Sequence, residues 1–286
     1  MNLIERNYCP GCKKQKFLKL FELSYSSKLI VKFLDEYYEK KIPHNVIRDK
    51  SYELHECQSC TMIFQKFIPD ELFSYELYEN IISKEKSLKK KTDNPNLNIV
   101  YDKELNLIKK ISKKKEIKIL DFGAGWGFWS KRALDSGFSV DSFELSKSRI
   151  DYMKKNNLNI INDLNKTDTL YDIIYSDQTL EHIPEPNKFF EDLTPKLSRD
   201  GYFMLNFPSS YNFKKNLNIN YIPNKDAAHP LEHINIFNRQ SIKKILEQHD
   251  LKLINFKWSK ELNLKNILKD FKNLIYFDNI LIKKKN

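Results

Sequence analysis

The sequence lacks long apolar runs: 41% of its 286 residues are hydrophobic, yet no stretch approaches the roughly 20 apolar residues needed to span a bilayer. Residues 1–8 also lack the apolar segment of a secretory signal peptide. These absences exclude a membrane-spanning protein. They predict a globular protein with enough apolar residues for a packed core, located in the cytoplasm.

Arginine is sparse, and the formal charge of +11 comes from lysines that are spread along the chain. A nucleic-acid-binding surface usually gathers its basic residues in one stretch or on one face. The even spread therefore argues against a nucleic-acid partner. It leaves a solvated surface, or an anionic small substrate such as a nucleotide-linked sugar, as the two interpretations.

Glycine is scarce as well, with six residues in the chain, yet Gly123, Gly125 and Gly127 fall within five positions. Glycine is needed where the backbone turns sharply or lies against a ligand, because any Cβ would clash there. The apolar run 117–120 before this cluster predicts a buried strand, and Trp129 with its successors keeps helical spacing. We expect a strand, a ligand-binding loop and a helix whose N-terminus faces a nucleoside-type cofactor.

A glycine missing from position 128 narrows the choice of cofactor. Dinucleotide-binding folds carry G-x-G-x-x-G, whose third glycine permits close helix packing, but Phe128 occupies that place. The stretch 121–127 instead reads D-x-G-x-G-x-G and resembles motif I of the class I S-adenosylmethionine (SAM) dependent methyltransferases. The resemblance implies that the loop approaches the methionine part of SAM and that its acid acts on the ammonium end. The residues concerned are Asp121, Gly123, Ala124, Gly125 and Gly127.

In that family a second strand ends in an acid that takes both ribose hydroxyls. Glu144 stands at the carboxyl end of the strand-like run 138–145, where Leu145 follows it and Ser146 is placed to cap the next helix. A carboxylate can accept both hydrogen bonds of a cis-diol. The alternative is an acid that merely flanks a turn.

The resemblance also implies a contact to adenine after a third strand, which we expect over 158–161. An acid or amide at this place hydrogen-bonds the adenine amino group, so Asp163 is the candidate, with Asn162 and Leu164 flanking the ring. The alternative is an ordinary loop.

A fourth strand, predicted over 171–176, leads into D-Q-T-L-E-H-I-P. This segment resembles motif IV of methyltransferases that act on small molecules. It lies beside the topological switch point, where open α/β sheets bind ligands, so Asp177 and Gln178 are expected to face SAM or the substrate. His182 has two interpretations: a base on the substrate side, or a residue that only orients the loop.

The remaining pattern continues the alternation of strands and helices. It predicts a Rossmann-like, seven-stranded class I methyltransferase sheet with helices on both faces. The resemblance implies that the seventh strand runs antiparallel between the fifth and the sixth. The expected helices are 99–111, 188–197 and 239–249, and the expected strands are 201–207, 251–257 and 277–283, with a turn at 199–201.

The four cysteines stand as two C-x-x-C pairs, Cys9 with Cys12 and Cys57 with Cys60. Two such turns can bring four thiolates to one tetrahedral ion, which predicts a closed, structural Zn²⁺ site. Disulfides are the alternative, but a cytoplasmic location argues against them. His44 and His55 lie in the same region and could replace a cysteine ligand.

This front part is expected to form a separate unit, a zinc-binding module with an aromatic helix over 1–92, before a methyltransferase domain over 93–286. Helical spacing over 28–40 and over 71–91 predicts two helices, with a strand-like run over 61–69 between them.

A two-knuckle zinc module followed by an aromatic helix and a SAM domain resembles bacterial methyltransferases that include sugar C-methyltransferases of deoxysugar biosynthesis. In those enzymes a Glu-His pair supplies the base, and Glu232-His233 stands at the matching place. The pair lies in a long unassigned segment, 208–236, which we expect to cover the substrate. The segment also holds Tyr211, Tyr221, His229 and Asn235.

The predicted function is SAM-dependent O- or C-methylation of a sugar or nucleotide-sugar for a surface polysaccharide or glycoside. A quinone-type O-methyltransferase is the alternative that the L-E-H-I-P segment allows. An RNA methyltransferase or a non-catalytic partner subunit is the alternative of another class. The motif N/D-P-P-[YF] of many nucleic-acid N-methyltransferases is absent after the fourth strand, which counts against it.

Overall fold

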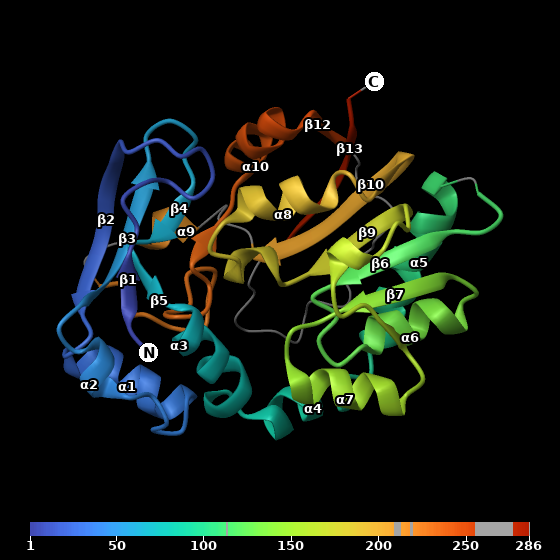
Figure 1. The fold of residues 1–286 in the computed structure, drawn as a ribbon. Helices are drawn as coiled ribbons and strands as arrows, with labels where there is room; N and C mark the ends of the chain where they lie inside the picture. Colours follow the sequence, from blue (N-terminus) through green and yellow to red (C-terminus); the bar gives the residue numbers. More distant parts are fainter. Residues whose placement is uncertain (113, 209–212, 218–219, 255–276, 286) are drawn as a thin grey trace.

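The computed structural model describes residues 1–112, 114–208, 213–217, 220–254 and 277–285. Figure 1 shows a large central sheet with helices on both sides, next to a smaller part built from the N-terminal strands. In the described ranges, no helix is long and apolar enough to cross a membrane.

The large sheet has seven strands in the order β12-β13-β10-β9-β6-β7-β8. Strand β13 is antiparallel to both of its neighbours, β10 and β12, while the other neighbouring strands are parallel. This arrangement confirms the expected class I methyltransferase sheet. The strands are β6 (Lys118–Phe122), β7 (Ser139–Phe143), β8 (Asn159–Ile160), β9 (Tyr171–Asp177), β10 (Leu197–Pro208), β12 (Leu251–Ile254) and β13 (Phe277–Lys284).

Both faces of this sheet are covered by helices. Neighbouring residues of a strand point to opposite sides, so each strand packs against helices on both faces. Ile119 and Met204 pack with helices α5 (Leu97–Ser112) and α6 (Phe128–Asp135), whereas Leu120 and Phe203 pack with α8 (Pro186–Leu193) and α10 (Arg239–Leu246). Figure 1 shows α6 and α7 (Lys147–Lys155) on the side of the sheet away from α8 and α10. The expectation of helices on both faces is therefore confirmed.

Several elements end elsewhere than expected. Helix α8 begins at Pro186, which is favourable at a first helical position. Strand β10 runs through the expected turn at 199–201 with a register shift between Leu197 and Tyr202. Helix α10 gives way to a 3₁₀ turn, η4 (Glu247–His249), before the left-handed residue Asp250. Residues 255–257 of the expected sixth strand lie outside the described part of the chain.

The N-terminal part holds a two-stranded sheet of β1 and β5 and a four-stranded sheet in the order β11-β4-β3-β2. The strand-like run over 61–69 is divided between β4 and β5. The expected helix over 28–40 ends early, at Tyr37, because Glu39 and Lys40 adopt left-handed backbone angles. The elements are β1 (Leu3–Glu5), β2 (Phe17–Ser24), α1 (Lys28–Tyr37), α2 (His44–Ile47), β3 (Ser51–Cys57), β4 (Ile63–Gln65) and β5 (Phe67–Pro69).

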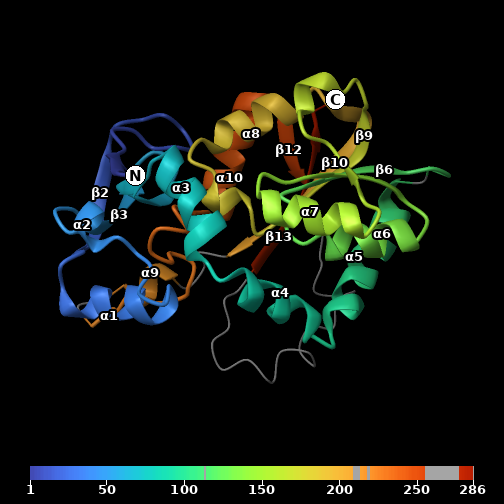
Figure 2. The ribbon, with the colours of Figure 1, turned by 60° about the horizontal axis from the view of Figure 1, so that its bottom comes forward.

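The single helix expected over 71–91 is wrong, since this region forms three pieces: α3 (Glu71–Glu76), the π-helical η1 (Leu77–Ile81) and α4 (Lys84–Thr92). Ile82 is extended and interrupts the helix. Ser83 then begins α4 as its N-cap, its hydroxyl accepting a hydrogen bond from the N–H of Lys86. The break lets α4 leave the N-terminal part and lie between it and the large sheet (Figure 2).

The long segment before α10 packs into the N-terminal part. Ala228, Leu231 and Ile236 join the core formed by Ile30 and Leu34 of α1. The segment includes α9 (Phe213–Asn216), and it ends in strand β11 (Asn235–Ile236), which pairs antiparallel with β4. Of the residues singled out in this segment, Tyr211 lies outside the described ranges.

Asn235 ties this segment to two other parts of the chain. Its side-chain oxygen accepts a hydrogen bond of 2.8 Å from the Arg6 guanidinium, and its amide nitrogen donates to the carbonyl oxygens of Ile183 at 2.6 Å and Leu180 at 3.4 Å. The residue is 1% exposed. One buried amide therefore connects the N-terminus, β11 and the turn that follows β9.

Replacing Asn235 with Ala should lower the free energy of unfolding by about 3 kcal/mol, because the buried Arg6 guanidinium loses the shortest of its hydrogen bonds and two carbonyls lose a donor. Urea unfolding of the metal-loaded protein measures the change. The exposed residue Asn216 supplies the control, and Asn216→Ala should stay within about 0.5 kcal/mol of the wild type. Equal changes in the two variants would show that Asn235 does not hold the segment.

Candidate active site and cysteine cluster

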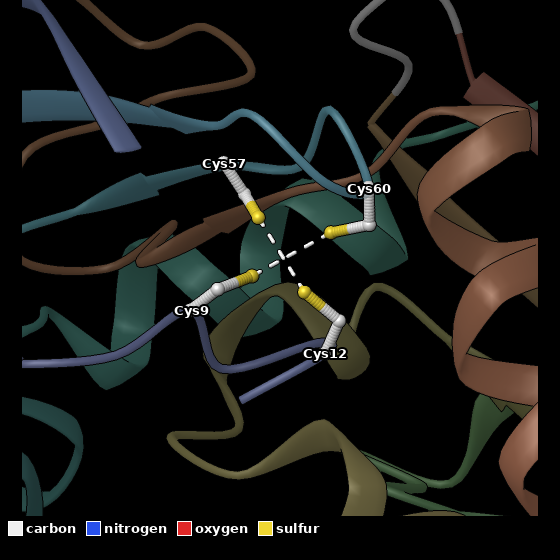
Figure 3. A group of neighbouring side chains, drawn as sticks. All are labelled: Cys9, Cys12, Cys57 and Cys60. Atoms are coloured by element: carbon white, nitrogen blue, oxygen red, sulfur yellow. Dashed lines mark hydrogen bonds between the residues drawn. The ribbon is translucent and has the colours of Figure 1, made fainter. Parts of the chain in front are cut away.

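The four cysteines lie together, with their sulfur atoms within 4.8 Å of one another. The Sγ atoms of Cys9 and Cys60 are 3.5 Å apart, and those of Cys12 and Cys57 are 3.4 Å apart. These distances are far longer than a disulfide bond of about 2.05 Å, and all four cysteines are free. Figure 3 shows the sulfurs pointing to one common centre, which is the arrangement of a tetrahedral metal site.

The two cysteine turns have the same local design. The N–H of Lys13 donates to the carbonyl of Cys9, and the N–H of Thr61 donates to the carbonyl of Cys57, each at 2.9 Å. Lys13 and Thr61 both adopt a φ of 60°, which closes each turn. The two histidines of this region lie outside the cluster, with His44 hydrogen-bonded to Asp35 and His55 to Glu53.

The glycine loop joins β6 to α6, and its three glycines have different surroundings. A Cβ on Gly123 would collide with the side chain of Thr179, and a Cβ on Gly127 would meet Leu158 and Met153. Gly125 has a φ of +58°, yet no atom lies within 4 Å of where its Cβ would be. Packing thus requires the outer glycines, while the middle one borders open space in which a ligand can lie.

Glu144 closes the other side of this space. Its carboxylate accepts hydrogen bonds from the N–H groups of Gly125, Leu145 and Ser146, at 2.8, 2.8 and 2.9 Å. The acid therefore joins the end of β7 to the glycine loop. Leu145 is 79% exposed beside it, which leaves an apolar side chain free to cover a ring. Ser146 takes the N-cap position of α7, although its side chain makes no capping hydrogen bond.

Two further acids lie at the ends of the neighbouring parallel strands β6 and β9. Asp121 is 2% exposed and accepts a hydrogen bond of 2.6 Å from Ser130, and burial raises its pKa to about 7. Asp177 accepts one of 2.8 Å from the amide of Asn206, and burial raises its pKa as well. Gln178 follows in a left-handed conformation. All of these groups lie at the carboxyl edge of the sheet, as expected.

The residues predicted to contact adenine lie in a short turn. Asp163 accepts a hydrogen bond of 2.9 Å from the N–H of Asn165 and caps the 3₁₀ turn η2 (Leu164–Lys166). Leu164 is half-buried and packs against the core next to α8. A contact of this turn to adenine stays a prediction.

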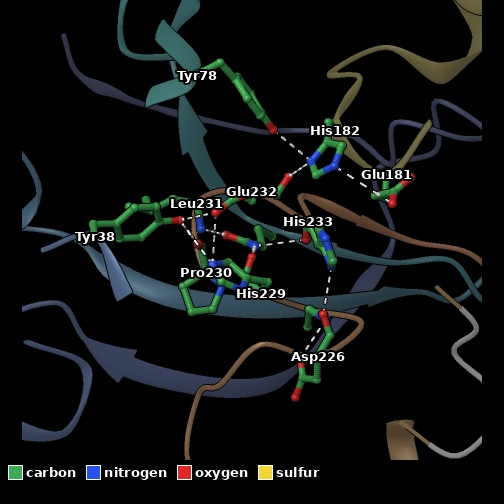
Figure 4. A network of polar contacts seen from close by, with 12 residues as sticks. Tyr38, Tyr78, Glu181, His182, Asp226, His229, Pro230, Leu231, Glu232 and His233 are labelled. Carbon is green, nitrogen blue, oxygen red and sulfur yellow. Dashed lines mark hydrogen bonds and ion pairs between the residues drawn. The ribbon is translucent and has the colours of Figure 1, made fainter. Parts of the chain in front are cut away.

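His182 and His233 come together from the two parts of the chain, with their ring centroids 5.1 Å apart. Nδ1 of His182 lies 2.8 Å from the carbonyl oxygen of Glu232, and Nδ1 of His233 lies 2.7 Å from that of Asp226 (Figure 4). A carbonyl can only accept, so each ring carries its proton on Nδ1 and leaves the lone pair of Nε2 exposed. Burial lowers the pKa of both imidazoles, which keeps them neutral near pH 7.

Glu232 is placed differently from the expected Glu-His pair. Its carboxylate accepts a hydrogen bond of 2.8 Å from Tyr38 and lies 3.2 Å from Nε2 of His229. Burial alone would raise the pKa of this carboxyl group, but the neighbouring imidazoles, His229 foremost, hold it below its usual range. The backbone carbonyl of Asp226, and not the carboxylate of Glu232, orients the His233 ring. The side chains of Glu232 and His233 point to different sides of the turn.

Sequence reasoning did not identify several residues at this site. Glu181 is 1% exposed, burial raises its pKa well above the ordinary value, and neither carboxylate oxygen has a hydrogen-bond partner among the described residues. Tyr78 places its hydroxyl 2.9 Å from Nδ1 of His182, and Trp126 of the glycine loop donates to Ser87 of α4 at 3.1 Å. Glu181 is the acid of the L-E-H-I-P segment, so the sequence motif already contained this residue.

Comparisons with known proteins give the family. A family model described as a methyltransferase domain matches residues 100–255, more than half of the chain. The plantazolicin methyltransferase BpumL, solved in complex with SAH (S-adenosylhomocysteine), is similar with a TM-score of 0.53 and 14% identity, over 74% of this chain and 94% of that chain. The plantazolicin methyltransferase BamL, solved with a triazolic desmethylPZN analog and SAH, has a TM-score of 0.54, again with 14% identity and shares of 74% and 94%.

No curated protein matches this chain. The family match covers the glycine loop, Glu144, Asp177 and His182, and the solved structures share its fold. This chain belongs to the methyltransferase domain family and is a SAM-dependent methyltransferase.

Proposed function

We propose that this protein methylates a small-molecule acceptor, and that the acceptor is a sugar or a nucleotide-sugar. The observation that carries the proposal is the position of two imidazoles with free Nε2 atoms at the same edge of the sheet as the glycine loop. Thr179, which packs on Gly123, precedes His182 by three residues. The groups that hold the cofactor and those that face an acceptor thus adjoin.

On the cofactor side, each residue has a role that its surroundings allow. The open space at Gly125 would hold the methionine part of SAM, with Asp121 near its ammonium group and Asp177 and Gln178 beside it. Glu144 would take the ribose diol in place of some of the three backbone N–H groups that it accepts from here. Leu145 and Leu164 would flank the adenine, with Asp163 at its amino group. When bound, SAM supplies an electrophilic methyl carbon that an oxygen or carbon nucleophile attacks in line.

On the acceptor side, we propose His233 and His182 as the catalytic residues. Each presents an Nε2 lone pair at the place where the acceptor loses its proton, and neutral imidazoles are suited to this role near pH 7. Glu232 acts as a positioning residue: its carbonyl holds His182, and its carboxylate is anchored by Tyr38 and His229.

Positive charge near the site supports an anionic acceptor. Lys91 and then Lys90, both on α4, counter the effect of burial on the pKa of Asp177. The amine of Lys225 lies over the ring of Tyr37, 5.1 Å from its centroid. Burial lowers the pKa of Lys90, and the positive charge of Lys225 repels that of Lys90 and lowers this pKa further. An acceptor phosphate near these amines would relieve this repulsion. The desmethylPZN analog bound by the fold relative BamL is also a small molecule, which supports the size of the acceptor.

The cysteine cluster, in this proposal, holds a structural Zn²⁺ ion. Four thiolates close the coordination shell, so no position stays open for water or substrate. The cluster packs against the methyltransferase part, because Asn187 of α8 donates to the carbonyl oxygen of Gly11 at 2.6 Å. The ion would therefore brace the N-terminal part against α8.

His233→Ala should lower methyl transfer by about 10²- to 10⁴-fold, because the acceptor proton loses its nearest lone pair. Transfer of labelled methyl from SAM to a panel of nucleotide-sugars measures turnover, and SAH titration checks that cofactor affinity stays within a few-fold. His44→Ala is the control, since His44 lies outside the site and should leave both unchanged. Unchanged turnover in His233→Ala would remove this residue from the mechanism, and a panel without any product would reject the sugar acceptor.

Adding one equivalent of Co²⁺ to metal-free protein should produce the thiolate-to-cobalt charge-transfer absorption of a tetrahedral sulfur site, which Zn²⁺ then displaces. Cys12→Ser should weaken this absorption and lower the affinity for Zn²⁺ at least about 10-fold. Ser59→Ala, within the second cysteine turn, is the matched control and should behave as the wild type. If the wild type shows no charge-transfer band after Co²⁺ has been added, the zinc site is contradicted.

A further inference from the structure

Glu181 carries a feature that methyl transfer by itself does not explain. Its side chain is 1% exposed, and neither carboxylate oxygen has a hydrogen-bond partner among the described residues. Burying a carboxyl group without a partner costs several kcal/mol, on the order of 2–7 for a neutral polar group. A bound ion would supply the missing partner.

We propose that Glu181, His182 and His233 bind a divalent transition-metal ion, at a site separate from the cysteine cluster. One ligand atom from each residue lies within 4.8 Å of those of the other two. Oε1 of Glu181 and Nε2 of His182 are 3.9 Å apart, which is too long for a hydrogen bond. The site takes two imidazoles from different parts of the chain and one carboxylate from the turn after β9.

The distances fit an ion. Metal bonds to nitrogen and oxygen of about 2.0–2.2 Å place two ligand atoms on one ion at most about 4.3 Å apart. The pair at 3.9 Å already lies within this limit. The other two separations are no more than 4.8 Å, so each has to shorten by at most about half an ångström to reach this limit.

The hydrogen bonds behind the two imidazoles match those of metal-bound histidines. Such ligands usually donate their other ring N–H to a carbonyl or carboxylate, which fixes the tautomer and the direction of the ring. Here Nδ1 of His182 is held by the carbonyl of Glu232 and the hydroxyl of Tyr78, and Nδ1 of His233 by the carbonyl of Asp226. The Nε2 atoms are therefore available without any change of tautomer.

The ligand set selects the kind of ion. Two imidazoles and one carboxylate suit Zn²⁺, Fe²⁺, Co²⁺ or Ni²⁺, whereas Mg²⁺ and Ca²⁺ prefer an all-oxygen shell. Three protein ligands leave at least one coordination position open, unlike the closed set of four cysteines. The side chain of His182 is 20% exposed, so this position can be reached from outside.

The role of the ion rests on the proposed function and deepens it. An acceptor hydroxyl in the open position would have a lower pKa and release its proton to water. Its oxygen then forms the bond to the methyl carbon as the carbon–sulfur bond breaks, and SAH leaves without the positive charge. In this form of the reaction, His182 and His233 act on the acceptor through the ion that their lone pairs hold.

Titration with Co²⁺ tests the site directly when the protein has been loaded with a single equivalent of Zn²⁺, which the four thiolates of the closed site take first. We expect one equivalent to bind, with d–d absorption but without a thiolate-to-cobalt charge-transfer band, because the cysteines already hold zinc. Glu181→Gln and His233→Ala should each weaken cobalt binding about 100-fold or more, and Tyr78→Phe about 10-fold, since it removes only a contact behind a ligand. His44→Ala should bind Co²⁺ as the wild type does.

Titration of each variant with SAH shows that it is folded. A wild type that binds SAH but takes up no cobalt, or takes it up only with a charge-transfer band, would overturn the metal site. Equal cobalt binding in Glu181→Gln would do the same. Methyl transfer that continues in protein treated with a chelator until its cobalt is removed would also reject the ion while leaving the proposed function standing, so the two can fail separately.

Discussion

The buried amide of Asn235 is the constraint on which the site depends. It accepts from Arg6 of the N-terminus and donates to the turn between β9 and α8, so it holds β11 on the small sheet and against the large one. His233 lies two residues before it, and His182 lies one residue before its carbonyl partner Ile183. Asn235 positions the backbones next to both rings, and Gln65 adds a hydrogen bond to the carbonyl oxygen of His233. The proposed acceptor side of the site therefore depends on the contact between the two parts of the chain.

The two parts contribute different chemistry to this site. The large sheet supplies the predicted cofactor side, where Gly125 borders an open space and Glu144 accepts from its N–H. The N-terminal part supplies Tyr38 and Tyr78, which hold Glu232 and His182 in position. The cysteine turns add a second connection, through the backbone near Gly11 and α8. A metal at the cysteines would thus stabilise the wall of the site without taking part in the reaction.

The sequence predicted what depends on regular patterns. Alternating apolar residues and the glycine cluster predicted where the strands and the loop lie in the sequence, whereas the place of the seventh strand in the sheet came from the family resemblance. Local geometry was not predictable: the extended Ile82 interrupts an apparently continuous helical pattern, and β11 has only two residues, too few for a periodic signal. The direction of Glu232 depends on a turn. Glu181 was overlooked because its motif drew attention to the histidine beside it.

The most direct measurement of the central claim is SAH binding to the wild type, to Gly125→Asn and to Gly137→Asn, by calorimetry. Both glycines have positive φ and open space around them, but only Gly125 borders the predicted cofactor site. Asn tolerates such backbone angles, so both variants should fold. The account predicts that Gly125→Asn weakens SAH binding by about 100-fold, roughly 2.7 kcal/mol, while Gly137→Asn binds as the wild type does. Equal affinity in all three proteins would place the cofactor elsewhere and contradict the account.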